Sequence, residues 1–161
     1  MKPKRQNRRD GDLFRERLGA IIDMDHSLVR LSGIVPWSTF DDAFGMHYRP
    51  LGRPAKSTRL MVGLHYLKHM ADLSDEETVE RWVENPYWQY FCGFQFFEHC
   101  LPIDPSSMTR WRKRIGPEGM ETVLAATVGV AVDAGAVKQS SFERITVDTT
   151  VQPKAIAHPT D

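Results

Sequence analysis

The apolar positions of this chain recur mostly at helical spacing, and the clearest example begins after Ser57. Apolar side chains three or four residues apart share one face of a helix, and four of them do so here: Leu60, Leu64, Leu67 and Ala71. Ser57 or Thr58 can cap the start of this helix with its hydroxyl. The pattern predicts an amphipathic helix that ends near residue 71.

Two histidines, His65 and His69, are four residues apart on the back of that helix and are therefore neighbours. Such a pair could bind a metal, but no Glu follows His65 as in the zinc-protease motif, and the sequence offers no evident third ligand. We therefore expect both imidazoles to face solvent.

A second helix begins with a strong capping signal. Ser74 and Glu77 have the spacing of a capping box, in which each side chain accepts a hydrogen bond from the backbone of the other residue. Asn85 and Pro86 stop the helix, and Pro86 can begin the next one. The aromatic residues between 82 and 97 resemble a base-stacking platform, but few basic residues surround them, so we interpret them as core.

Residues 104–116 predict a short helix with one apolar and one basic side. Asp104 suits the N-cap, Pro105 the first helical position and Gly116 a left-handed end. The apolar stripe consists of Met108, Trp111 and Ile115. At about 100° per residue, five polar side chains point away from this stripe: Ser106, Ser107, Arg110, Lys113 and Arg114.

A basic helix anchored by a tryptophan suits the phosphate backbone or a groove of DNA. The candidate DNA-binding residues are Ser106, Ser107, Arg110, Arg112, Lys113 and Arg114. The alternative is a solvated basic surface helix, which is a common feature. The short helices that precede it favour a helix-turn-helix-like arrangement.

The pattern changes in the last quarter of the chain. After Gly116 a further helix with a broad apolar face, which includes Val123 and Leu124, extends to about residue 135. Residues 145–151 then alternate apolar and polar side chains with a period of two, which predicts a strand. Asp148 lies on its polar side between threonines, where a hard divalent cation would find oxygen ligands.

Composition narrows the function classes. The net charge is zero, but residues 1–17 hold seven Lys and Arg against three acids, and residues 71–84 hold six acids against one Arg. A zinc site built on Cys92, His99 and Cys100 would lack the usual paired spacing. No apolar run reaches the roughly 20 residues of a membrane span, and no signal peptide is evident. We expect a cytoplasmic protein with reduced thiols and no membrane partner.

Several motifs occur together in one order: Gly52-Arg53-Pro54, the helix at residues 60–73, Leu73-Ser74-Asp75-Glu76, the aromatic block at residues 85–93, the basic block at residues 104–116, residues 147–154 and residues 158–161. From about Trp37 to the last residue, this ordered set resembles the InsH-type N-terminal domain of bacterial insertion-sequence transposases.

The resemblance implies a helical DNA-binding region followed by a ribonuclease-H-like catalytic domain with three metal-binding acids (DDE). It implies that Asp148 is the first of these acids and a ligand of Mg²⁺, which would drive phosphoryl transfer on DNA. The DNA partner would be the terminal inverted repeats of the element. The second Asp and the Glu of the family have no counterpart before residue 161, so we expect this chain alone to be inactive and to bind no metal.

We therefore expect a mainly α fold: a helical bundle with a helix-turn-helix-like element, followed by the first β-strand of an incomplete ribonuclease-H-like α/β domain. The expected divisions are a basic arm and short helical lead-in (1–36), a helical DNA-binding domain (37–135) and the start of a truncated catalytic domain (136–161). The expected function is DNA binding for transposition. Two alternatives stay open: a helical interaction module that forms a homo-oligomer, and one half of a split or frameshifted active transposase.

Overall fold

The computed structural model describes residues 16–45, 47 and 55–133, and regular structure in these ranges is helical. One isolated antiparallel bridge joins Arg17 to Phe96. The helices are α1 (Leu18–Ile21), α2 (Ser27–Ile34), α3 (Trp37–Gly45), α4 (Thr58–Ala71), α5 (Asp75–Glu84), α6 (Pro86–Phe91) and α7 (Ser106–Asp133). The prediction of a mainly α fold is therefore confirmed for the described residues. The predicted strand and Asp148 lie outside them, and the domain boundaries stay predictions.

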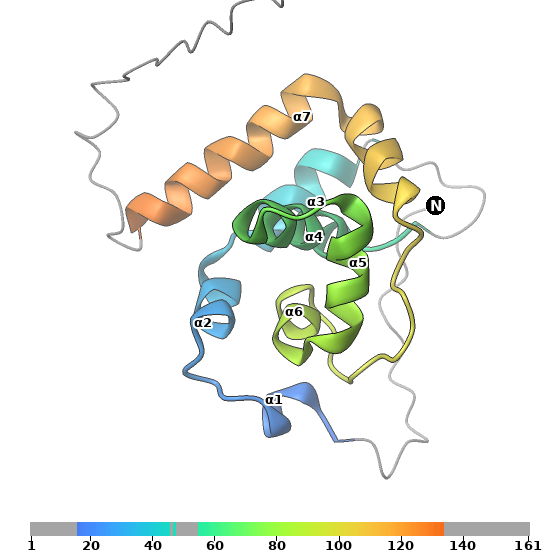
Figure 1. Cartoon of the computed structure of the whole chain (residues 1–161). Coiled ribbons are helices and arrows are strands. Elements are labelled where there is room, and N and C mark those ends of the chain that lie inside the picture. The colour runs from blue at the N-terminus through green and yellow to red at the C-terminus, as the bar shows by residue number, and fades with distance from the viewer. Residues whose placement is uncertain (1–15, 46, 48–54, 134–161) are drawn as a thin grey trace, which may run out of the picture.

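Helix α4 forms the centre of the fold, with α3, α5 and α7 packed around it (Figure 1). Its start is capped as predicted, because the Ser57 hydroxyl accepts a hydrogen bond from the Leu60 N–H at 3.2 Å. In the predicted stripe, Leu60, Leu64 and Leu67 are fully buried, and Ala71 at the end of the helix is half-buried. Because neighbouring helices cover more than one side of α4, residues outside the stripe, such as Val62, are also buried.

A tight turn connects α4 to α5. Asp72 ends α4 in the left-handed conformation, with φ of 52°, which Asp tolerates better than most residues. The capping box at the start of α5 is present as predicted: Ser74 Oγ accepts from the Glu77 N–H at 3.1 Å, and the Glu77 carboxylate accepts from the Ser74 N–H at 2.8 Å. The first residue of α5, Asp75, is therefore held on a well-ordered helix start.

Asn85 separates α5 from α6 and serves both. It ends α5, and its side-chain oxygen accepts hydrogen bonds from the N–H groups of Tyr87 and Trp88 at the start of α6. The prediction that the aromatic segment is core is confirmed for Trp82, Trp88 and Phe91, which are buried.

The long connection between α6 and α7, residues 92–105, is held by the buried side chain of Gln89. Its amide nitrogen donates to the Glu98 carbonyl at 2.8 Å, and its oxygen accepts from the Glu98 N–H at 2.7 Å. The turn of a helix-turn-helix has only three or four residues. The arrangement of α6 and α7 therefore does not confirm the predicted helix-turn-helix-like element.

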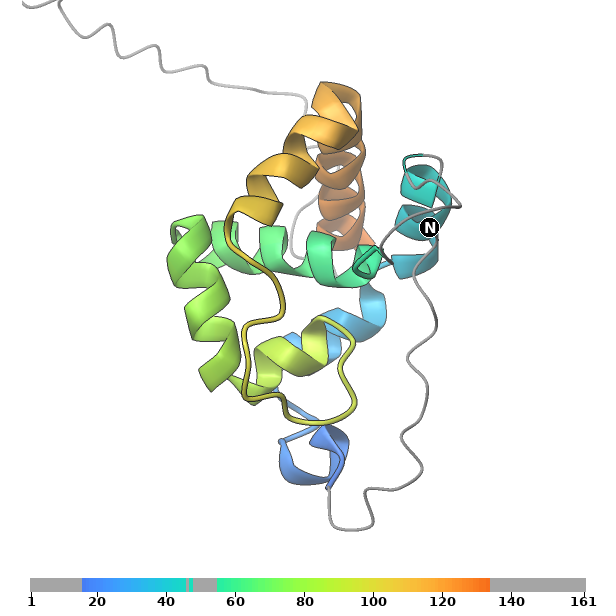
Figure 2. The same cartoon turned by 90° about the vertical axis from the view of Figure 1, so that its right-hand side faces the viewer.

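Helix α7 bends at Gly116, so that its two parts run in different directions (Figures 1 and 2). Gly116 has φ of 69°, as predicted for a residue that ends a helix, and Pro117 starts the second part. Residues 106–115 and 117–133 are therefore two helical segments. The broad apolar face predicted for the second segment is only partly correct, because Val123 is buried whereas Leu124 is 63% exposed. Val130, which was not part of the predicted face, is also buried.

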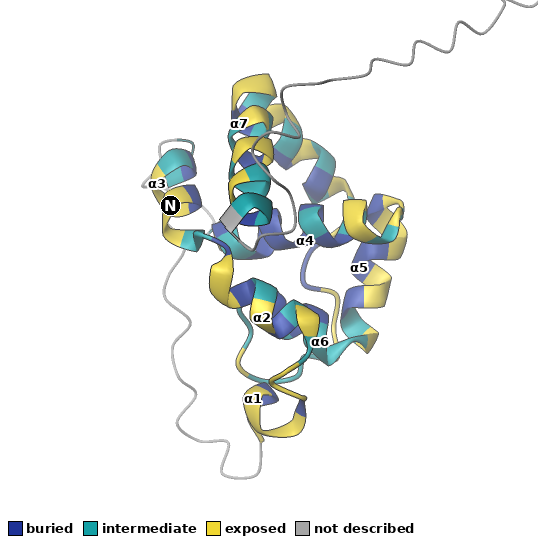
Figure 3. Cartoon of the chain, turned by 90° about the vertical axis from the view of Figure 1, so that its left-hand side faces the viewer, coloured by how far each residue is buried: buried dark blue, intermediate teal, exposed yellow. Residues whose placement is uncertain are grey.

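Exposed and buried residues alternate along the helices, so that each of the longer helices has an exposed outer side (Figure 3). The core instead runs from α3 through α4 to the inner side of α7. The predicted basic segment is therefore covered on one side by the core and open on the other.

Candidate nucleic-acid interface

The predicted basic helix begins where the sequence indicated. The Asp104 carboxylate accepts a hydrogen bond from the Ser106 N–H at 2.9 Å, and it also accepts one from the Ser106 hydroxyl. These contacts hold the pKa of Asp104 below its usual value. Pro105 follows one residue before α7 begins at Ser106, where its missing N–H costs no hydrogen bond.

One side of residues 106–115 is anchored in the core. Met108, Trp111 and Ile115 are no more than 5% exposed, as their predicted apolar stripe requires. The Trp111 ring meets the Phe44 ring edge to face, with centroids 5.4 Å apart, and lies 4.9 Å from the His65 ring. This aromatic contact fixes the segment against α3 and α4.

The opposite side carries the predicted cations. Ser106, Arg110, Lys113 and Arg114 are exposed and Ser107 is half-buried; we call these five residues the basic face. Arg110 donates a hydrogen bond to the Ser106 hydroxyl and lies 3.9 Å from the Asp104 carboxylate, and both side chains of this ion pair are 70% exposed. So exposed a pair holds Arg110 only weakly. In the described part of the chain, no ion pair engages Lys113 or Arg114.

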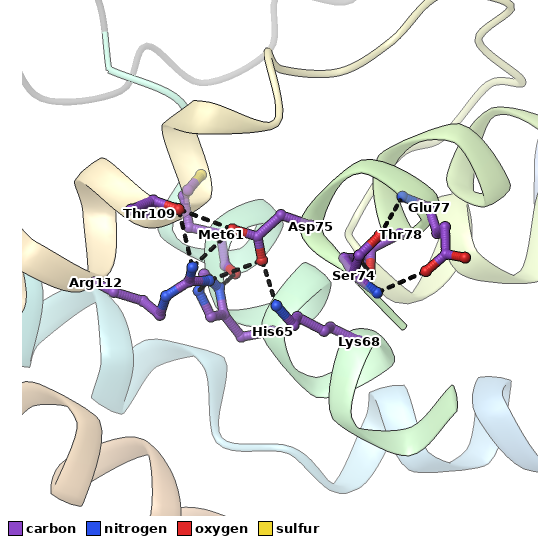
Figure 4. Close-up of polar contacts among 9 residues, drawn as sticks. All are labelled: Met61, His65, Lys68, Ser74, Asp75, Glu77, Thr78, Thr109 and Arg112. Carbon is purple, nitrogen blue, oxygen red and sulfur yellow. Dashed lines mark hydrogen bonds and ion pairs between the residues drawn. The ribbon is translucent and has the colours of Figure 1, made fainter. Parts of the chain in front are cut away.

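Arg112 differs from the other predicted DNA-binding residues, because its guanidinium points into the protein (Figure 4). Its Nη1 and Nη2 atoms donate to the two Asp75 oxygens at 2.9 and 2.7 Å. Nη2 also donates to the Thr109 hydroxyl at 3.0 Å. Both terminal nitrogens are thus engaged with protein groups, and the prediction that Arg112 contacts DNA stays untested.

Asp75 accepts hydrogen bonds at both of its oxygens from three different side chains. In addition to Arg112, Lys68 donates to Oδ1 at 2.6 Å and Thr109 donates to Oδ2 at 2.9 Å. The Arg112 hydrogen bonds, supported by those from Lys68 and Thr109, hold the pKa of Asp75 far below its usual range. Asp75 is only 8% exposed, so this charge is compensated by the protein rather than by water.

His65 completes this cluster, and its position corrects a prediction. We expected both histidines of α4 to face solvent, but His65 is 1% exposed while His69 is exposed. The His65 Nδ1 lies 2.7 Å from the Met61 carbonyl oxygen, and Nε2 lies 3.2 Å from Arg112 Nη1. Only a neutral ring that donates from Nδ1 and accepts at Nε2 satisfies both contacts. Burial lowers the pKa of His65 to about 4, which agrees with the neutral form.

The cluster was not predicted as a unit. Lys68 lies on α4 and Arg112 on α7, and their local patterns gave no sign that they would meet at Asp75 on α5. A signal was present for Arg112 alone: at about 100° per residue it lies about 200° from Arg110, on the other side of the helix.

The described residues contain no group of three or more His, Cys, Asp or Glu side chains that could hold a metal ion. The members of the zinc alternative differ in environment, since Cys92 is buried and Cys100 is exposed. Asp148, the predicted Mg²⁺ ligand, lies outside the described residues. No helix in the described part of the chain is long and apolar enough to cross a membrane.

Comparison with known proteins identifies the family. The family model described as "Transposase domain (DUF772)" matches residues 16–114, which include α1 to α6 and nearly all of the basic segment. A protein of Rhizobium meliloti named "Uncharacterized protein ORF8 in nfe locus" is 65% identical over 161 residues, which cover all of this chain and 78% of that relative. No solved structure shows a significant match. The family model and the relative together show that this chain belongs to the DUF772 family of transposase domains.

Proposed function

We propose that the chain binds DNA through the basic face of α7 and serves as the DNA-binding part of a transposase. The family supports this proposal because a transposase must hold the DNA that it moves. The observation that carries it is the division of residues 106–115 into an anchored side and an open side on which Arg110, Lys113 and Arg114 are exposed.

The size and chemistry of the basic face suit a duplex. Its helical segment of ten residues is about 15 Å long, which is comparable to the major groove width of about 12 Å. Arg110, Lys113 and Arg114 would contact phosphates, and the serine hydroxyls near the helix start would add hydrogen bonds to the backbone. We propose the terminal inverted repeats of the element as the DNA partner.

We further propose, on the resemblance, that Asp148 is one Mg²⁺ ligand of the transposase, in which a two-metal site for strand transfer needs several carboxylates. DNA binding is the activity that the described residues support, because the basic face lies among them.

The experiment is a binding assay of the full chain with labelled duplexes that carry the inverted repeats, against scrambled duplexes of the same length. We expect tighter binding to the repeats, and we expect the combined variant Arg110→Ala/Lys113→Ala/Arg114→Ala to bind both duplexes much more weakly. Arg30→Ala is the matched control, because Arg30 is exposed on α2, which lies apart from the basic face (Figure 1).

Two results would contradict the proposal. If the wild-type chain binds no DNA, the proposed function is wrong. A combined variant that binds like the wild type, while Arg30→Ala weakens binding, would place the interface elsewhere on the molecule.

A further inference from the structure

The basic segment of α7 is short, and it is not continued as a straight helix at either end. It follows the long connection at residues 92–105, and the bend at Gly116 interrupts its continuation into residues 117–133. Its rotation about its own axis therefore depends on the contacts that residues 106–115 make with the rest of the fold.

Two kinds of contact meet this segment. The apolar stripe around Trp111 decides which side faces the core, but apolar contacts have little directional preference. The ion pair between Arg112 and Asp75 is directional, since two parallel N–H···O bonds require a fixed angle between guanidinium and carboxylate. Asp75 itself is held by the start of α5 and by the hydrogen bond from Lys68.

The structure points to a positioning role for this ion pair, and we propose that Asp75, acting through Arg112, sets the rotation of α7 at which the basic face meets DNA. This inference rests on the proposed DNA binding and deepens it. Asp75 and Arg112 need not touch DNA, because their effect passes through the axis of the helix to the opposite side.

The scale of the effect follows from helix geometry. A helix with side chains has a radius of about 6 Å, so a rotation of about 20° moves a residue at its surface by about 2 Å. A hydrogen bond to phosphate tolerates only a few tenths of an ångström around its preferred length. A small rotation would therefore separate several cations of the basic face from their phosphates together.

The direction in which Asp75→Asn changes the affinity for DNA distinguishes a positioning role from a simple effect of charge. This change removes one negative charge, so electrostatics alone predicts tighter binding to a polyanion. Positioning predicts the reverse, because Asn has only one acceptor oxygen and cannot form the two-pronged pair with the guanidinium. Arg112→Lys adds a second distinction: Lys keeps the charge that a phosphate contact would need, but it cannot form the two-pronged pair.

The test measures the affinity of Asp75→Asn, Arg112→Lys and Arg112→Ala for the inverted-repeat duplex, at a temperature where circular dichroism shows each variant to be folded. Glu80→Gln is the matched control, since it removes the same charge from an exposed position on the same helix. We expect the affinity of all three test variants to fall by about tenfold. We expect Glu80→Gln to bind as well as the wild type or slightly better.

The possible contrary results contradict either the positioning role or the proposed function. Asp75→Asn that binds as tightly as Glu80→Gln would refute the positioning role. So would Arg112→Lys that binds like the wild type while Arg112→Ala does not, because Arg112 would then contact DNA directly. If Asp75→Asn does not fold, the affinity of Arg112→Lys for the duplex tests the positioning role instead. A wild type that binds no DNA would instead refute the proposed function, so the two failures are distinguishable.

Discussion

Arg110 and Arg112 are two residues apart on α7, yet their side chains face opposite sides of the helix. The Arg110 side chain is 70% exposed, whereas that of Arg112 is 29% exposed and lies 2.7 Å from Asp75. The run of cations between residues 110 and 114 is therefore not one uniform patch. Three of these cations belong to the basic face, and the fourth, Arg112, holds the segment to α5.

The neutral state of His65 predicts a pH-dependent stability. Burial lowers its pKa from 6.5 to about 4, so between these values the unfolded chain binds a proton that the folded chain does not. The free energy of unfolding therefore rises with pH across this window. Between pH 6.5 and about 4 the contribution amounts to about 3 kcal/mol, and it is lost as the solution becomes more acidic.

Urea unfolding between pH 7 and about 4 would measure this contribution, with His65→Phe as the control. The variant keeps an aromatic ring but cannot titrate or accept from Arg112, so it should be less stable at neutral pH and should lose less stability on acidification. Parallel pH profiles for the two proteins would show that His65 is not the group responsible. Asp75, whose pKa is lowered, should add a further loss only below the usual carboxyl range.

Two glycines of α7 should respond to the same substitution in opposite directions. Gly116 has φ of 69°, a conformation that costs an alanine about 2 kcal/mol. Gly129 lies in a regular helical part, and an added Cβ would meet nothing within 4 Å. Gly116→Ala should therefore lower the free energy of unfolding, whereas Gly129→Ala should raise it by up to about 1 kcal/mol.

Chemical denaturation of both variants checks this pair of predictions. Neither substitution changes charge, and neither added Cβ meets a neighbour in the described structure, so backbone conformation alone separates them. An equal change in both midpoints would mean that the bend at Gly116 is not maintained in solution.

The two cysteines should differ in reactivity toward a thiol reagent. Cys92 is 1% exposed, and burial raises the pKa of its thiol to about 12, so almost no thiolate is available at neutral pH. Cys100 is exposed. Titration of the native chain should therefore modify Cys100 quickly and Cys92 only after unfolding, and fast modification of both would contradict the burial of Cys92.

Local signals in the sequence were sufficient for the basic segment. The cap at Asp104 and the glycine at residue 116 each act on the adjacent backbone, and the structure confirms both. The stripe of Met108, Trp111 and Ile115 follows from helical periodicity alone and is buried. Features decided within one helical segment were thus accessible to reasoning from the sequence.

Contacts between distant segments were not accessible in this way. His65 lies outside the predicted stripe of α4, and it is buried because α7 covers that side as well. The partner of Arg112, Asp75, is 37 residues away. The helical position of Arg112 already indicated that it faces away from Arg110, but no local pattern could identify the acid that receives it.

The salt dependence of DNA binding tests the central claim most directly. Each phosphate contact lowers the slope of log affinity against log salt concentration by about 0.9. If Arg110, Lys113 and Arg114 each contact a phosphate, the combined alanine variant should bind the inverted-repeat duplex with a slope shallower by about 2.7 than that of the wild type. The Arg30→Ala control should keep the wild-type slope. A combined variant with an unchanged slope would show that the basic face of α7 does not contact DNA.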